Sequence, residues 1–190
     1  MRRGELARSA HLDRFTRDSL PPPEQWPDLL LDRPEFRYAA RLNCAVELLD
    51  RNIARGRGDH PAIVTPAETL TYSQLADRVD RIARVLVTRF GLVPGNRVLL
   101  RSANNAWMVA AYFAVLKAGG VVVASMPLLR AKELGQMLRK GRISHALCDA
   151  RLAEELWKAE APDLRHLVTW GDGQLEGLCA AAAPGFPACD

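Results

Sequence analysis

The sequence predicts an α/β fold with three layers, in which a mostly parallel sheet lies between helices on both of its faces. From about residue 97 onward, short apolar runs alternate with stretches of helical periodicity, which is typical of βαβ units. Val121–Ala124 is a β-branched run suited to a parallel strand that is buried on both faces. With 48% apolar and 25% charged residues, the 190-residue chain can bury a core without a disulfide or a metal.

Residues 1–40 are expected to form an extended arm that precedes a domain of residues 41–190. Prolines such as Pro21–Pro23 restrict the backbone and remove hydrogen-bond donors, so we expect only one short helix here, near Leu6 to Asp13. Three aromatic residues would anchor the arm on the domain: Trp26, Phe36 and Tyr38.

The domain is expected to begin with a helix and a hairpin. Asn43 can cap a helix that ends near Gly56, and Ala62–Val64 and Leu70–Tyr72 have the composition of two short strands joined by a turn.

A capping box then starts the helix with the clearest pattern in the chain. Thr71 and Gln74 have the spacing at which each side chain bonds the backbone amide of the other residue. Apolar residues repeat behind them on one helical face: Leu75, Val79, Ile82, Ala83, Leu86 and Phe90.

A strand at Val98–Leu100 and a buried helix over Ala106–Lys117 follow. Asn104 or Asn105 can cap this helix, and because the helix is apolar nearly all round we expect it to be buried. The pair Gly119–Gly120 ends it with a left-handed residue and leads into the valine-rich strand.

Two further strands and helices complete the expected sheet. The strands are His145–Cys148 and His166–Thr169, and the helices are Lys132–Lys140 and Leu152–Ala159. The last fourteen residues, 177–190, match no element.

Composition and charge exclude several classes of function. The net charge of +4 comes from basic residues scattered along helices, without a basic block or stacking aromatic residues, so no nucleic-acid partner is expected. The longest apolar run, Ala106–Leu116, has eleven residues, whereas a membrane-spanning helix needs about 20. The four cysteines form no CxxC and no Cys/His cluster, which argues against zinc and favours a cytoplasmic location.

Spacing alone predicts neither a catalytic constellation nor a metal site. The sequence has no phosphate loop with a following lysine and no nucleophile elbow, and the glycine pair at 119–120 closes a helix instead of opening one. His145 and His166 each precede an apolar strand, where histidines are ordinarily half-buried at an edge. Asp149 ends an expected strand, so it either faces a ligand or caps the next helix.

Three segments resemble the motifs of one enzyme family, in the order in which that family has them. Leu70–Leu75 (LTYSQL) resembles the first core motif of the adenylate-forming enzymes, the superfamily of acyl-CoA synthetases, peptide-synthetase adenylation domains and luciferases. Leu116–Val123 (LKAGGVVV) resembles their second core motif, and Gly91–Val98 matches the turn and strand between the two. The similarity runs from about Asn43 to the end. Ala106 departs from it, because the family commonly has proline there.

Further segments are similar to the aryl-CoA ligases within that superfamily: Leu92–Arg101, Asn104–Trp107, Val122–Arg130 and Ile143–Arg151. This resemblance implies that ATP, with magnesium, activates a small aromatic carboxylic acid as its AMP ester, and that coenzyme A then accepts the acyl group. It implies 2-aminobenzoate as the acid, with benzoate or another aryl or acyl acid as the alternative. A non-catalytic α/β binding or interaction module, prone to self-association, is the alternative of a different class.

The resemblance places no catalytic residue in this chain. The phosphate loop, the hinge and the C-terminal domain of the family all follow the position of Asp190, so we expect an N-terminal subdomain that is inactive alone. Met126 and Pro127 lie near where the family passes the pantetheine arm of coenzyme A, and Arg151 could meet a coenzyme A phosphate. The alternative for these residues is a turn and a helix-surface charge.

Overall fold

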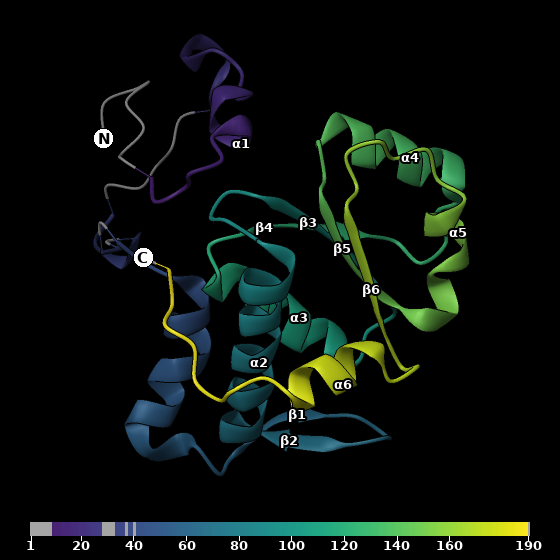
Figure 1. Ribbon diagram of the computed structural model, residues 1–190. Helices are drawn as coiled ribbons and strands as arrows, with labels where there is room; N and C mark the ends of the chain where they lie inside the picture. The colour runs from purple at the N-terminus through teal and green to yellow at the C-terminus, as the bar shows by residue number, and fades with distance from the viewer. Residues whose placement is uncertain (1–8, 28–32, 37, 40, 190) are drawn as a thin grey trace.

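A four-stranded sheet forms the centre of the domain. The computed structural model describes residues 9–27, 33–36, 38–39 and 41–189. All neighbouring strands of the sheet are parallel, in the order β4-β3-β5-β6 (Figure 1), as the sequence predicts. Their bounds are Arg97–Arg101 for β3, Val121–Ser125 for β4, His145–Asp149 for β5 and His166–Trp170 for β6.

Helices cover both faces of the sheet, which gives the three expected layers (Figure 1). On one face lie α2 (Tyr72–Phe90), α3 (Ala106–Lys117) and α6 (Gln174–Ala180). On the other face lie α4 (Ala131–Lys140) and α5 (Glu154–Trp157). The helix expected over 152–159 is shorter than predicted, because a 3₁₀ turn at Ala150–Leu152 comes before α5.

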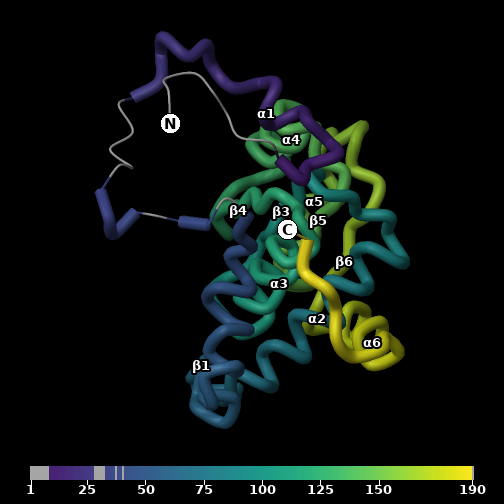
Figure 2. The backbone as a smooth tube through the Cα atoms, turned by 90° about the vertical axis from the view of Figure 1, so that its left-hand side faces the viewer, coloured from purple at the N-terminus to yellow at the C-terminus, as the bar shows by residue number. Residues whose placement is uncertain are grey.

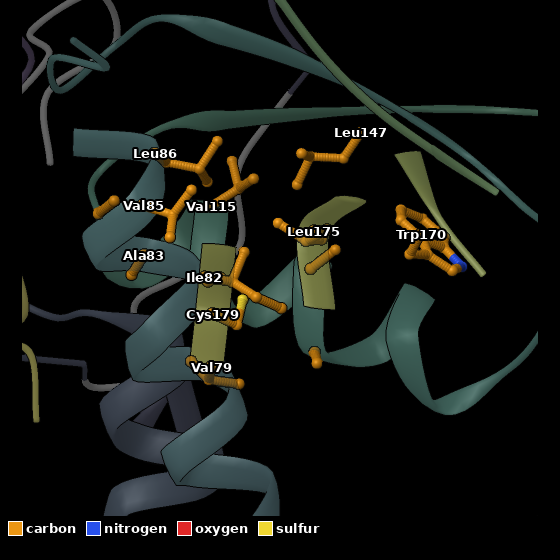
Figure 3. Packing of buried hydrophobic residues seen from close by; sticks show 14 of the residues in the cluster. Val79, Ile82, Ala83, Val85, Leu86, Val115, Leu147, Trp170, Leu175 and Cys179 are labelled. Atoms are coloured by element: carbon orange, nitrogen blue, oxygen red, sulfur yellow. The ribbon is translucent and has the colours of Figure 1, made fainter. Parts of the chain in front are cut away.

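Side chains of β3 alternate between two hydrophobic cores. Val98 and Leu100 join the cluster under α2 and α3, whereas Leu99 joins the cluster under α4 and α5, and all three are 0% exposed. Figure 3 shows the first cluster, in which side chains of α2, α3 and α6 meet those of the sheet. Because successive residues of a strand point to opposite faces, one apolar run fills both cores.

Helical turns and a hairpin precede α2. Residues Val46–Asp50 and Ile53–Arg57 have π-helical hydrogen bonding, so the first expected helix is present with widened turns. β1 (Pro61–Val64) and β2 (Thr69–Thr71) pair in antiparallel fashion, as two short strands joined by a turn should.

The expected caps fix the ends of α2 and α3. The capping box is confirmed: the Gln74 amide donates to Thr71 Oγ1 at 3.2 Å, and the Thr71 amide donates to Gln74 Oε1 at 2.9 Å. Asn105 caps α3 by accepting from the Met108 amide at 2.8 Å. Gly119 has a φ of 75°, the left-handed conformation predicted for the end of α3.

One expectation about burial is wrong, and another holds with one exception. β4 is an edge strand, and Val121–Val123 are half-buried, because only β3 pairs with β4 among the described residues. α3 is buried or half-buried as expected except at Tyr112, which is 42% exposed although all the residues of the helix before Lys117 are apolar. In both cases the apolar sequence shows that the residues are suited to burial. Which of them are buried depends on the elements that lie beside β4 and α3 in the fold.

The arm packs against the loop that leads into β3. Its helix is α1 (Phe15–Asp18), whereas residues 9–13 of the expected helix are not helical and residues 6–8 lie outside the described residues. The amides of Leu12 and Asp13 both donate to the carbonyl of Pro94 at 3.0 Å. In Figure 2, as in Figure 1, this segment lies at the end of the molecule opposite the β1–β2 hairpin.

The anchors of the arm differ from the aromatic residues that were expected. Phe36 and Tyr38 are 38% and 68% exposed, and the Trp26 indole donates to a carbonyl within the arm. Instead, the Asp13 carboxylate pairs with the Arg97 guanidinium, which lies 4.7 Å from the centre of the Phe15 ring. An ion pair and a cation–π contact therefore attach the arm.

The sequence predicts no element over residues 177–190, but α6 extends to Ala180, and the residues after it lie along α2 as a strap (Figure 1). Arg81 donates to the carbonyl of Ala182 at 2.6 Å, and Arg84 donates to that of Ala183 at 3.0 Å. The strap is thus held by arginines of α2 through backbone carbonyls, which leave no trace in the strap's own sequence.

Candidate functional site

The three residues proposed for coenzyme A lie at one edge of the sheet. Met126 and Pro127 directly follow β4, and Arg151 follows β5. β3 lies between those two strands. Ligands of open α/β sheets bind beyond the carboxyl ends of the strands, and all three residues lie at those ends.

Arg101, the last residue of β3, joins the two loops. Its Nη1 donates to the Met126 carbonyl and its Nη2 to the Pro127 carbonyl, both at 2.8 Å. Nη2 also donates to Leu129 at 2.8 Å, and Nε donates to the Leu152 carbonyl at 3.2 Å. The residue is 1% exposed, so the two loops share a buried cation.

Sequence reasoning missed Arg101. Its only signal is an arginine that directly follows the apolar run Val98–Leu100, and such a residue is ordinarily a solvated strand end. The structure shows it buried because carbonyls from two loops surround its guanidinium.

Arg151 is oriented by Asp149. The Asp149 carboxylate accepts from Arg151 Nε at 2.9 Å, from Nη2 at 2.6 Å and from the Arg151 amide at 3.1 Å. The hydrogen bond from the Arg151 side chain is the main cause of the lowered pKa of Asp149, and burial opposes it. Of the two roles expected for Asp149, the cap is therefore present, and the Arg151 side chain remains 78% exposed.

A second contact ties the same two loops together. Glu155 of α5 accepts from the Ala131 amide at 2.8 Å and from Arg130 Nη1 at 3.2 Å. The Ala131 amide is the main cause of the lowered pKa of Glu155. The start of α4 is thus fixed against α5, and the loop after β4 is held at both of its ends.

The loop after β4 presents apolar side chains beside cations. Met126 is 63% exposed and Leu128 is 80% exposed. The side chains of Arg130 and Arg151 are each 78% exposed. An ordered loop with this surface suits a ligand that has a long, weakly polar part and an anionic part.

The opposite edge of the sheet holds the histidine pair. His145 is 4% exposed on an inner strand, so it is more buried than expected, and its ring lies 5.0 Å from that of His166. His145 Nε2 bonds the Phe90 carbonyl at 2.9 Å, and Nδ1 bonds Ser144 Oγ at 2.8 Å. These contacts satisfy both ring nitrogens within the fold.

The described ranges contain neither a metal site nor a membrane-spanning helix. No group of three or more His, Cys, Asp or Glu side chains there is arranged to hold a metal ion. None of the helices there combines the length and the apolar character needed to cross a membrane. Burial raises the pKa of the Cys148 thiol to about 12, which makes it a poor nucleophile at neutral pH.

Comparison with known proteins identifies relatives over most of the chain. A benzoate–CoA ligase of Thauera aromatica is 31% identical over 156 residues, which are 80% of this chain and 29% of that protein. A salicyl-AMP ligase of Mycobacterium tuberculosis is 34% identical over 73% of this chain and 26% of its own length. The chain therefore spans less than a third of these curated relatives.

Solved structures share the fold. A benzoate CoA ligase from Burkholderia xenovorans matches with a TM-score of 0.69 and 26% identity, over 78% of this chain and 30% of its own. An anthranilate CoA ligase, solved with anthranoyl-AMP, matches with a TM-score of 0.69 and 24% identity, over 76% of this chain and 28% of its own.

A model of a protein family also matches most of the chain. The model described as "AMP-binding enzyme" matches residues 49–183, which include both core motifs and every strand of the sheet. The chain belongs to the family of AMP-binding enzymes.

Proposed function

We propose that this chain is part of an ATP-dependent ligase that joins an aryl acid to coenzyme A. The observation that carries the proposal is the match to ligases of benzoate and salicylate over 73–80% of the chain. The four segments that resemble the aryl-CoA ligases support 2-aminobenzoate as the acid, with benzoate as the alternative. Four free cysteines support a cytoplasmic location.

The proposed reaction has two steps. The carboxylate attacks the α-phosphorus of ATP, which releases pyrophosphate and forms an acyl-AMP ester. The coenzyme A thiol, as its thiolate, then attacks the acyl carbon, and AMP leaves. The activation is needed because a free carboxylate is a poor electrophile, whereas AMP is a good leaving group.

Within this chain, the proposed role is to bind coenzyme A. Met126 and Pro127 would contact the pantetheine arm, and Arg151 would meet a phosphate. Their support is the shared edge of the sheet and the exposure of Met126 and Arg151. The arm of residues 1–40 and the subdomain of residues 41–190 remain our proposed division.

Pyrophosphate exchange tests the proposal. We expect the product of the whole reading frame to catalyse exchange of labelled pyrophosphate into ATP with 2-aminobenzoate, more weakly with benzoate, and not with decanoate. The polypeptide of residues 1–190 should show no exchange above background. An exchange stimulated only by decanoate, or by none of the three acids, would contradict the proposal.

Calorimetry on residues 1–190 distinguishes the proposed ligase subdomain from the alternative, a non-catalytic α/β binding module. Tight binding of ATP by these residues alone would favour a self-sufficient binding module. We expect no ATP binding, because the sequence holds no glycine-rich phosphate loop with a following lysine.

A further inference from the structure

We infer that Arg101 is a positioning residue for coenzyme A, holding the loop after β4 in the shape that offers Met126 and Leu128 to the pantetheine arm. The inference rests on the proposed function. Arg101 itself does not face the ligand, since it is 1% exposed, and it acts through the loop whose carbonyls it binds.

The buried charge of Arg101 restricts the loop after β4 to one conformation. Arg101 makes no ion pair with any of the described residues, and its guanidinium is surrounded by four backbone carbonyls. A buried cation without a carboxylate is costly unless its donors are satisfied. Any movement that withdraws the carbonyls of Met126, Pro127 or Leu129 therefore leaves a charge unsatisfied.

The guanidinium also fixes the apolar side chains after β4 relative to the cation after β5. Its bonds join the loop that carries the exposed Met126 and Leu128 to the 3₁₀ turn that carries the exposed cation of Arg151. Coenzyme A joins a long, weakly polar arm to phosphate groups. A planar fork with several fixed donors can hold both loops at once, whereas an ammonium cannot.

Arg97 provides a matched control within the same strand. It is 7% exposed and begins β3, four residues before Arg101. It too binds loop carbonyls, those of Gly141 at 2.8 Å and Arg142 at 2.7 Å, at the opposite edge of the sheet. Because Arg97 also pairs with Asp13 of the arm, its substitution should cost at least as much stability as that of Arg101, and only the Arg101 substitution should affect the coenzyme A loop.

The test separates the two half-reactions in the product of the whole reading frame. We expect Arg101→Lys to raise the KM for coenzyme A by about tenfold while acyl-AMP formation stays within about twofold. Arg97→Lys should leave the KM for coenzyme A unchanged. An Arg101→Lys enzyme with an unchanged KM for coenzyme A, or with the KM for ATP raised equally, would overturn the inference.

A replacement variant and a measurement on the wild-type enzyme allow a failed test to be interpreted. If Arg101→Lys does not fold, Leu128→Ser replaces it, because an 80% exposed side chain is not needed for folding. It should raise the KM for coenzyme A selectively, and no rise would count against the inference. A wild-type enzyme that forms no acyl-AMP refutes the proposed function instead, so the two failures differ.

Hydrogen exchange on residues 1–190 tests the tether directly. In the wild type, the Leu129 amide donates to the Met126 carbonyl at 3.2 Å within the loop. We expect the amides of Met126 and of residues 128–130 to exchange several-fold faster in Arg101→Lys and at the wild-type rate in Arg97→Lys. Equal exchange in all three proteins would show that Arg101 does not hold the loop.

Discussion

Lys117 shows how a single buried charge can be kept in this fold. Its ammonium lies 2.5 Å from Asp80 and 2.9 Å from Asp50, and its side chain is 5% exposed. Burial opposes the charged form, but hydrogen bonds with Asp80 and Asp50 outweigh it and raise the pKa of Lys117. The lysine of the second core motif therefore joins α3 to α2 and to the π-helical segment Val46–Asp50.

Lys117→Met tests this role. The substitution leaves two carboxylates without their cation, so we expect the free energy of unfolding to fall by about 3–5 kcal/mol. Urea denaturation followed by circular dichroism at pH 7 measures the change. Lys140→Met, at an exposed position in α4, is the control and should change stability by less than about 0.5 kcal/mol. Equal losses in the two variants would contradict the role of Lys117.

His145 makes stability depend on pH. Burial lowers its pKa, against the hydrogen bond with the Phe90 carbonyl, and the neighbouring His166 and Arg165 lower it further. The unfolded chain therefore binds more protons than the fold at pH values just below 6.5, the ordinary pKa of histidine. The stabilisation from neutral His145 is complete above that pH and is lost progressively as the pH falls below it.

The expected slope is at most about 1.4 kcal/mol per pH unit. Urea denaturation between pH 5.5 and about pH 8 measures it. His145→Gln should flatten the profile, whereas His60→Gln, at an exposed position, should not. A wild-type profile that is flat below pH 6.5 would show that His145 is protonated at no cost.

Asp149, which the sequence indicated, and Arg101, which it did not, differ in how far their partners lie along the chain. Asp149 was expected at a strand end as a ligand contact or a cap, and both choices follow from local sequence. Arg101 was missed because its partners are the backbone carbonyls of residues 126, 127, 129 and 152, and every residue has a backbone carbonyl. A side chain that binds main chain in space leaves no signature in spacing.

At the scale of elements, prediction succeeded where the signal was local. The capping box at Thr71 and the left-handed Gly119 were both foreseen, because each depends on residues within one turn. The exposed edge of β4 and the exposed Tyr112 on α3 were not foreseen, because they depend on which elements lie beside them. The anchors of the arm were misjudged for the same reason, since the partner of Asp13, Arg97, lies more than 80 residues away.

The arm itself gives a prediction at this scale. Burial alone would raise the pKa of Asp13, but the hydrogen bonds from the Phe15 amide and the Arg97 side chain outweigh it and lower the pKa below 3.8. The Asp13 contribution is thus complete above about pH 4 and is lost as the pH falls through the lowered value. At neutral pH the charge can be removed only by mutation.

We expect Asp13→Asn to release the arm at pH 7. Loss of a charged hydrogen bond costs about 1.5 kcal/mol, which corresponds to roughly tenfold faster tryptic cleavage after Arg14 and Arg17. Asp18→Asn is the control, because the ion pair that Asp18 makes within the described part of the chain is with the exposed Arg14 of the arm itself. Cleavage of Asp13→Asn at the wild-type rate would show that other contacts hold the arm.

At the scale of the whole molecule, segments distant in sequence meet at Asn43. Its Nδ2 donates to the carbonyls of Leu116 at 3.0 Å and Cys189 at 2.7 Å, and its Oδ1 accepts from the Ala45 amide at 3.0 Å. One side chain thus links the beginning of the domain, the end of α3 and the strap. Hydrogen bonds between a side chain and distant backbone groups therefore stabilise the domain in addition to its two hydrophobic cores.

Whether the two cores unfold together can be tested at β3. Leu99 and Leu100 are adjacent and both 0% exposed, yet they belong to opposite clusters. Each substitution by alanine should cost about 2–5 kcal/mol, through lost burial and a cavity. Because β3 is shared, we expect Leu99→Ala and Leu100→Ala each to lower one cooperative transition. With Trp26, Trp107 and Trp157 replaced by phenylalanine, the fluorescence reports Trp170, which lies in the Leu100 cluster. Its midpoint should equal that of far-ultraviolet circular dichroism in both variants. If Leu99→Ala produced a dichroism change that preceded the fluorescence change, α4 and α5 would form a layer that unfolds on its own.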